Sequence, residues 1–200
     1  MKKTNIRRLS LAAMMGAIAF VFLFVNFSIP VISPFAEFDA AALPELIGGF
    51  VLGPIGAVEI ILVKLLLKIV IVGTESMYTG ELQNLILSFA FVLPAVIFYR
   101  RHRTKKGAVI GLVIGSLCKI VVGVFTNMFI IFPFYIELYG MNWDAIIGMC
   151  SALIPAIHDI PTVVLFSIVP FNVLSRTLSS VITILVYKKI SVPLKKIAAQ

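Results

Sequence analysis

Two lysines interrupt an otherwise apolar stretch of the chain. Residues 61–73 read ILVKLLLKIVIVG, which places Lys64 and Lys68 one helical turn apart on the same face of a helix. A lysine at the centre of a bilayer costs about 2.5–3.5 kcal/mol on insertion scales, so two like charges here need compensation. The one acid of the same predicted helix, Glu59, lies on the opposite side and cannot supply it. The spacing therefore predicts a cavity whose cationic lining binds an anion.

Two alternatives remain open for these lysines. Glu81 or Glu59 could form an ion pair with them inside the protein. Lys68, which lies nearer the predicted outer end of its helix, could instead extend its ammonium group to the lipid headgroups.

Other polar side chains also fall inside predicted membrane spans. Lys119 lies near mid-depth in a later apolar stretch, and Asn127 follows about two turns further on. Asn172 comes soon after Pro170, which we expect to kink its helix, and Arg176 lies one turn deeper. Polar groups within a membrane face the protein interior or a water-filled cavity, although each asparagine could equally hold two helices together. The predicted substrate-binding residues are Lys64, Lys68, Glu81, Asn84, Lys119, Asn127, Asn172 and Arg176.

The sequence shows no pattern typical of catalysis or metal binding. It contains no H-E-x-x-H motif, no G-x-S-x-G elbow and no phosphate-binding loop with Gly-Lys-Ser/Thr. His158 and Asp159 adjoin a proline and fit hydrogen bonds within a loop, and the isolated Cys118 and Cys150 fit small core residues. We therefore predict no catalytic residue, no metal site and no cofactor in this chain, which disfavours an intramembrane enzyme.

The composition places all of these residues in a lipid environment. The 200 residues are 60% hydrophobic and 13% charged, with a mean hydropathy of +1.10, whereas soluble domains carry about 25% charged residues. We predict an all-α fold that forms a single transmembrane domain over residues 1–200. The N-terminal segment is basic and then apolar, as in a signal peptide. Its apolar run is longer than that of a usual signal peptide, so we expect a retained first helix. The predicted spans are residues 9–32, 41–53, 55–73, 81–99, 107–135 and 161–187, the second being short and open to a re-entrant alternative.

Charge placement predicts the topology. Most of the 17 basic residues fall near the N-terminus, in the segment 100–106 and near the C-terminus. The positive-inside rule puts these three regions in the cytoplasm, which six transmembrane helices with both termini cytoplasmic would satisfy. The net charge of +8 is then a topology signal, and no nucleic acid partner is expected. The predicted location is the cell membrane of a prokaryote, in contact with lipid, as a multi-pass protein.

The first span carries two pairs of small residues. Ala12 and Gly16 form one pair and Ala13 and Ala17 form the other, each with the small-xxx-small spacing that lets another helix approach closely. These positions predict a surface for docking a partner, and packing within the six-helix bundle is the alternative.

The order of several motifs resembles a known family. The chain contains FAEFDAAALPELIGGFVLGPIGA, then K-x-x-x-K, TGELQNL, FVLPAVIFYRRHRTKKGAVIG, TNMFIIFPFY and VPFNVLSR. This order is similar to the S component of energy-coupling factor (ECF) vitamin transporters, in the branch with riboflavin-, pyridoxine- and pantothenate-type members. The resemblance covers essentially the whole chain.

The resemblance implies a substrate-binding membrane subunit of six helices. It would capture a vitamin from outside and deliver it by toppling in complex with a T component and two cytoplasmic ATPases. ATP and Mg²⁺ would be used by those partner chains. The small residues of the first helix would form the docking face, and a loop over residues 35–39 would act as a lid. A stand-alone secondary carrier or a channel is the rival interpretation, although carriers usually show two related halves.

Departures from the riboflavin-type pattern bear on the vitamin. Riboflavin-type members usually have Asn directly after the third-span lysine, where this chain has Leu65, and a lysine where it has Ser175. Lys68 and Lys119 make the predicted pocket more cationic. These differences favour an anionic vitamin, pantothenate, with riboflavin or a pyridoxine- or pyrimidine-like vitamin as the alternative.

Overall fold

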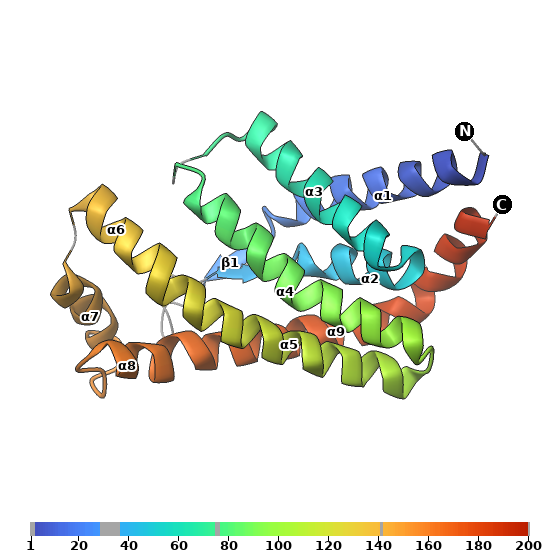
Figure 1. The fold of residues 1–200 in the computed structure, drawn as a ribbon. Coiled ribbons are helices and arrows are strands. Elements are labelled where there is room, and N and C mark those ends of the chain that lie inside the picture. The colour runs from blue at the N-terminus through green and yellow to red at the C-terminus, as the bar shows by residue number, and fades with distance from the viewer. Residues whose placement is uncertain (1–2, 29–36, 75–76, 141, 200) are drawn as a thin grey trace.

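The chain folds into a bundle of helices that run between two ends of the molecule (Figure 1). This computed structural model describes residues 3–28, 37–74, 77–140 and 142–199. One end holds the start of α1, the connection between α4 and α5 and the far part of α9, and the other end holds α6, α7 and α8 (Figure 1). The elements are α1 (Lys3–Phe22), β1 (Asn26–Ser28), β2 (Glu37–Asp39), α2 (Ala42–Leu52), α3 (Pro54–Ile71), α4 (Thr79–Arg101), α5 (Lys105–Thr126), η1 (Asn127–Ile131), α6 (Phe132–Tyr139), α7 (Trp143–Ser151), α8 (Ile160–Val163), η2 (Val164–Ile168) and α9 (Val169–Ala199).

Within the described residues, three helical stretches are long and apolar enough to cross a membrane. These stretches are Thr79–Arg101, Lys105–Leu138 and Ile160–Tyr187. Among the other described helices, α2 has only 11 residues, and α3 is apolar but carries three charged residues, Glu59, Lys64 and Lys68. The short second helix is confirmed, whereas six crossings and cytoplasmic termini stay predictions.

The all-α fold class is confirmed, but the predicted length of the first span was wrong. The first span was predicted to run to residue 32, but α1 ends at Phe22 and a two-stranded antiparallel ladder pairs Asn26 with Asp39 and Ser28 with Glu37. Backbone groups of these residues hydrogen-bond across the ladder instead of along a helix, which ends the first helix early. The predicted lid over residues 35–39 lies partly outside the described residues, and its last three residues form β2.

Each of the π-helical segments in the described residues ends two residues before a proline. Pro133 follows η1 by two residues, and Pro170 follows η2 by two residues. A proline ring collides with the carbonyl four residues earlier, and the wider π turn relieves this collision. The distortion expected near Pro170 is therefore present as a π segment that widens the helix before it reaches Asn172.

A glycine stripe brings α4 and α5 into close contact. A Cβ atom at Gly111 would lie 2.7 Å from the backbone oxygen of Ala95, and one at Gly115 would collide with the backbone oxygen of Phe91. Small residues four apart let two helix backbones approach closely in lipid. This contact carries Lys119, one turn beyond Gly115, to the buried face of α4.

Candidate functional site

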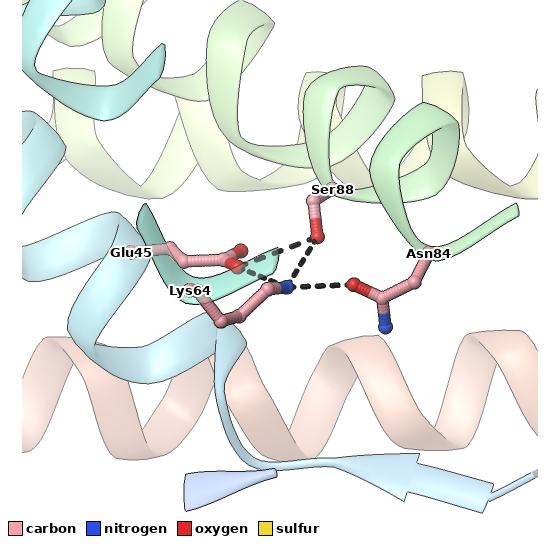
Figure 2. Close-up of polar contacts among 4 residues, drawn as sticks. All are labelled: Glu45, Lys64, Asn84 and Ser88. Atoms are coloured by element: carbon pink, nitrogen blue, oxygen red, sulfur yellow. Dashed lines mark hydrogen bonds and ion pairs between the residues drawn. The ribbon is translucent and has the colours of Figure 1, made fainter. Parts of the chain in front are cut away.

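Lys64 is at the centre of a fully buried polar cluster. Its ammonium lies 2.5 Å from Glu45 Oε1, and neither side chain is exposed. It also donates hydrogen bonds to Asn84 Oδ1 at 2.7 Å and to Ser88 Oγ at 3.1 Å. Figure 2 shows these groups converging from α2, α3 and α4, with Ser88 bonded in turn to Glu45 at 3.4 Å. A lysine ammonium has three donors, so the protein itself supplies an acceptor for each.

This cluster corrects the first hypothesis for Lys64. We expected an anionic ligand to balance its charge, whereas Glu45 of α2 does so within the protein. The internal ion pair was an open alternative, but with Glu81 or Glu59 as the partner. Glu45 was missed because only the packing of α2 against α3 places it beside Lys64. The available signal was an acid in the first turn of an otherwise apolar helix.

Lys68 also has a carboxylate partner within the protein. Its ammonium lies 3.0 Å from Glu81 Oε1, and the side chain is 31% exposed while that of Glu81 is 4% exposed. Glu81 Oε2 accepts a hydrogen bond from Thr74 at 3.0 Å. The ion pair with Glu81 is thus confirmed for Lys68, and an anionic ligand is not needed to balance it. Thr74 was not predicted, since a threonine in a loop gives no signal of its own.

A group of amide side chains connects α4 to the start of η1. Gln83 of α4 donates to Asn127 Oδ1 at 3.3 Å, and Asn127 donates to the backbone oxygen of Gly123 at 2.7 Å. Asn172 donates to the backbone oxygen of Ile168 at 2.9 Å, and a Cβ atom at Gly123 would lie 3.9 Å from its amide nitrogen. The structure therefore brings Asn127 and Asn172 to one place between α4, α5 and α9. Asn127 begins the η1 segment, and π turns occur frequently at functional sites.

Two further predicted cations meet at one aromatic ring. Lys119 Nζ lies 6.0 Å from the centroid of the Phe91 ring, and the Arg176 guanidinium carbon lies 5.1 Å from it. Both side chains are buried, and Arg176 also donates to Ser175 Oγ at 2.7 Å. Contacts of a cation with a ring face contribute about 0.5–2 kcal/mol when the pair is desolvated.

Three of these groups meet one face of α4. Glu81, Asn84, Ser88 and Phe91 succeed one another at helical spacing and reach Lys68, Lys64 and the Lys119–Arg176 pair in turn. Six of the eight predicted substrate-binding residues thus lie on this polar face of α4 or in contact with it, and Asn127 and Asn172 both lie beside Gly123. The arrangement can hydrogen-bond a polar molecule, and the charges of Lys64 and Lys68 are already balanced.

The predicted docking residues separate into two environments. Ala12 is fully buried, and a Cβ atom at Gly16 would lie 2.6 Å from Val63 Cγ1 of α3. This pair packs inside the bundle, so its predicted role in docking is corrected. Ala13 and Ala17 are exposed on the opposite side of α1.

Comparison with known proteins decides the family. The family model described as "ECF transporter, substrate-specific component" matches residues 7–187. The chain belongs to this family. The resemblance seen in the motifs is therefore confirmed, and this S component is part of a transport system and not an enzyme.

Relatives of this S component align over nearly its whole length. The riboflavin transporter RibU of Staphylococcus aureus (strain TCH60) is 28% identical over 96% of this chain and 94% of its own length. The riboflavin transporter FmnP of Bacillus subtilis (strain 168) is 23% identical over 93% of each chain. A solved structure, entitled "Structure and mechanism of the S component of a bacterial ECF transporter", matches with a TM-score of 0.72. That protein is 28% identical, and the match covers 96% of this chain and 99% of the other. Both named relatives are riboflavin transporters, which does not support the preference for pantothenate.

Proposed function

We propose that this S component binds riboflavin and acts as the substrate-binding subunit of an ECF-type uptake transporter. The choice of vitamin rests on the observation that carboxylates within the protein balance the charges of the lysines. Lys64 is paired with Glu45 and Lys68 with Glu81. A site built in this way suits a neutral ligand that forms many hydrogen bonds. Riboflavin has this chemistry, since it combines a flat, uncharged ring system with a polyhydroxylated chain.

The similarity to riboflavin transporters supports the same choice. Two named relatives match more than nine-tenths of this chain. The earlier argument against riboflavin rested on a cationic pocket that lacked internal partners, and the ion pairs remove that argument for Lys64 and Lys68.

The proposed contacts divide the predicted residues by role. Asn127 and Asn172 offer partly buried amides that both lie near Gly123, so they are proposed to hydrogen-bond the vitamin directly. Lys64 and Asn84 are proposed to hold three helices in register around the site, since the ammonium of Lys64 is occupied by protein acceptors. Glu81 and Lys68 are proposed to border the ligand, and Lys119 and Arg176 to line its deeper side.

The proposed transport cycle needs partner chains. A T component and two cytoplasmic ATPases would use ATP and Mg²⁺, and vitamin release would follow toppling of the S component in the cell membrane. The exposed residues Ala13 and Ala17 are the proposed docking positions on α1. Their small side chains would let a helix of the T component approach closely.

A binding titration of the isolated chain tests the proposal. The full chain, purified in neutral detergent without ATP, is titrated with riboflavin while flavin fluorescence is recorded, and pantothenate is added as competitor. We expect saturable quenching by one riboflavin per chain that pantothenate does not reverse. Binding of pantothenate, with no binding of riboflavin by calorimetry, would refute the proposal.

A further inference from the structure

A large cavity lies at the end of the bundle that carries the basic α4–α5 connection. Its volume is about 490 Å³, and it lies between the end of α4, the start of α5 and the later part of α9. The residues that line it are Phe50, Tyr99, Arg103, Thr104, Lys105, Ala108, Val109, Thr183, Ile184, Leu185 and Tyr187. This end is opposite to α6, α7 and α8 (Figure 1), so the cavity is separate from the polar face described above.

A second cavity adjoins the first on the other side of Tyr99. It has a volume of about 210 Å³ and shares Phe50, Tyr99 and Arg103 with the larger one. Arg100 also lines it, and this guanidinium packs so closely over Gly53 that a Cβ atom there would collide with it. None of the residues that line the two cavities, all within the described ranges, is acidic.

Aromatic rings form a fixed floor for the larger cavity. The hydroxyl groups of Tyr99 and Tyr187 are hydrogen-bonded at 2.9 Å, which joins α4 to α9. The Phe50 ring centroid lies 4.6 Å from that of Tyr99 and 5.4 Å from that of Tyr187. Rings in mutual contact through three helices hold the floor in one conformation, so the cavity is formed in advance of any ligand.

The wall of the cavity is apolar and opens toward the surface of the bundle. Val109 is 43% exposed, Ile184 is 42% exposed and Leu185 is 67% exposed. In a membrane such side chains contact acyl chains. The cavity thus combines an apolar wall with a rim that carries Arg103 and Lys105, and an amphipathic anion matches both parts.

The start of α5 adds positive potential to the rim. Lys105, which lines the cavity, begins this helix, the first turn holds no acidic residue, and Thr104 caps the helix by accepting from Gly107 at 2.9 Å. The N-terminus of a helix already carries partial positive charge, so lysines there are unfavourable unless an anion is close. The positive-inside rule accounts for the number of basic residues in this connection, but not for a cavity beside them.

We propose that this cavity binds the headgroup of an anionic phospholipid, with the phosphate at Arg103 and Lys105 and an acyl chain along Val109, Ile184 and Leu185. Basic pockets between transmembrane helices are known to bind such headgroups. The lipid would connect the ends of α4, α5 and α9. This site is independent of the vitamin bound at the other end.

Two double variants of the same loop test the proposal. Arg103→Gln with Lys105→Gln removes the charges of the rim, and Arg101→Gln with Lys106→Gln removes the same charge from neighbours that line neither cavity. Native mass spectrometry of the full chain in neutral detergent measures binding of dioleoyl phosphatidylglycerol, dioleoyl phosphatidylcholine and soluble glycerol 3-phosphate.

We expect phosphatidylglycerol to bind in preference to phosphatidylcholine. The rim variant should bind it about tenfold more weakly, and the control variant should stay close to the parent chain. Three results would each overturn the proposal: equal losses in both variants, equal binding of the two lipids, or displacement of the lipid by glycerol 3-phosphate. Equal size-exclusion profiles of the two variants establish that both are folded.

Discussion

The ammonium group of Lys64 lies 2.5 Å from the carboxylate of Glu45, and neither side chain has any exposed surface. The pair joins α3 to α2, while Asn84 and Ser88 of α4 complete the hydrogen bonds of the ammonium (Figure 2). Removing two charges from water is costly, and the attraction between them offsets that cost only when the remaining donors are satisfied. Three helices are therefore held in register by one lysine.

Breaking this pair from one side should destabilise the protein strongly. Lys64→Met leaves the Glu45 carboxylate buried without its partner, and we expect a loss of about 3–5 kcal/mol in the free energy of unfolding. Glu45→Leu should cost a similar amount, whereas the double variant should recover most of the loss. Circular dichroism follows unfolding in detergent for the parent chain, the two single variants and the double variant. Together these four measurements give the coupling energy between the two side chains. Additive effects of the two substitutions would show that the pair contributes no mutual stabilisation.

The pair formed by Lys68 should contribute less. Its side chain is 31% exposed, so water screens the attraction to Glu81. We expect Lys68→Met to reduce the free energy of unfolding by about 1 kcal/mol or less. The same unfolding assay applies, with Lys64→Met as the reference. A loss as large as that of Lys64→Met would contradict the difference in burial.

Asn127 should contribute to vitamin binding more than to stability. Its amide is partly buried at the start of η1, where it accepts from Gln83. We expect Asn127→Ala to weaken riboflavin binding by about 1–2 kcal/mol, the range for one hydrogen bond in a buried site. Thr177→Ala on α9 is the control, because Thr177 is exposed on the outside of the bundle and donates to the backbone oxygen of Val173. Equal riboflavin affinities for Asn127→Ala and the parent chain would exclude a direct contact.

The two sides of α1 should respond differently to a large side chain. Ala17 is exposed, so Ala17→Trp should leave riboflavin binding intact and abolish uptake by cells that contain the partner subunits; Ala13→Trp should behave in the same way. Ala12 is fully buried, so Ala12→Trp should instead reduce the amount of folded protein, because a well-packed interior does not accommodate added volume. Riboflavin binding, cellular uptake and yield after size exclusion are measured for each variant. Full uptake with Ala17→Trp would place the docking surface elsewhere.

The capping box at α8 should depend on pH. Hydrogen bonds from the side chain and then the backbone of Thr162 hold the pKa of Asp159 below its usual value. Because the folded pKa is the lower one, the charged cap stabilises α8 above the unfolded pKa and is lost as pH falls through the folded pKa. The amide resonance of Thr162, followed by NMR in acid titration, should report this loss. The same titration in Asp159→Asn should be flat, and an unchanged pH dependence would assign the effect to another group.

Much of the helical architecture could be predicted from the sequence. The predicted spans 41–53, 55–73 and 81–99 agree within two residues with α2, α3 and α4. Hydropathy is a local property of the chain, so these helices needed no knowledge of their neighbours. Local hydropathy did not predict the early end of α1. The ladder between β1 and β2 pairs residues that are distant in sequence, such as Asn26 and Asp39.

The polar positions of the site were also visible in the sequence, because a charged residue within an apolar run has few explanations in lipid. Lys64, Lys68 and Lys119 were identified on this basis, and all three lie in the interior or beside it. The sequence did not show that Glu45 is the partner of Lys64. Glu45 precedes Lys64 by several helical turns, and only the packing of α2 against α3 brings them together.

The amino-acid order by itself determined that the chain lies in a membrane, where α2, α3 and α4 begin and end, and which polar groups require compensation. The tertiary structure alone decided how that compensation is achieved and which face of α1 is free, since Ala12 and Ala13 differ by one residue but point in different directions. The physical reason is that burial in lipid follows from the average of a local stretch, whereas an ion pair or a contact face depends on how helices are rotated and packed against each other.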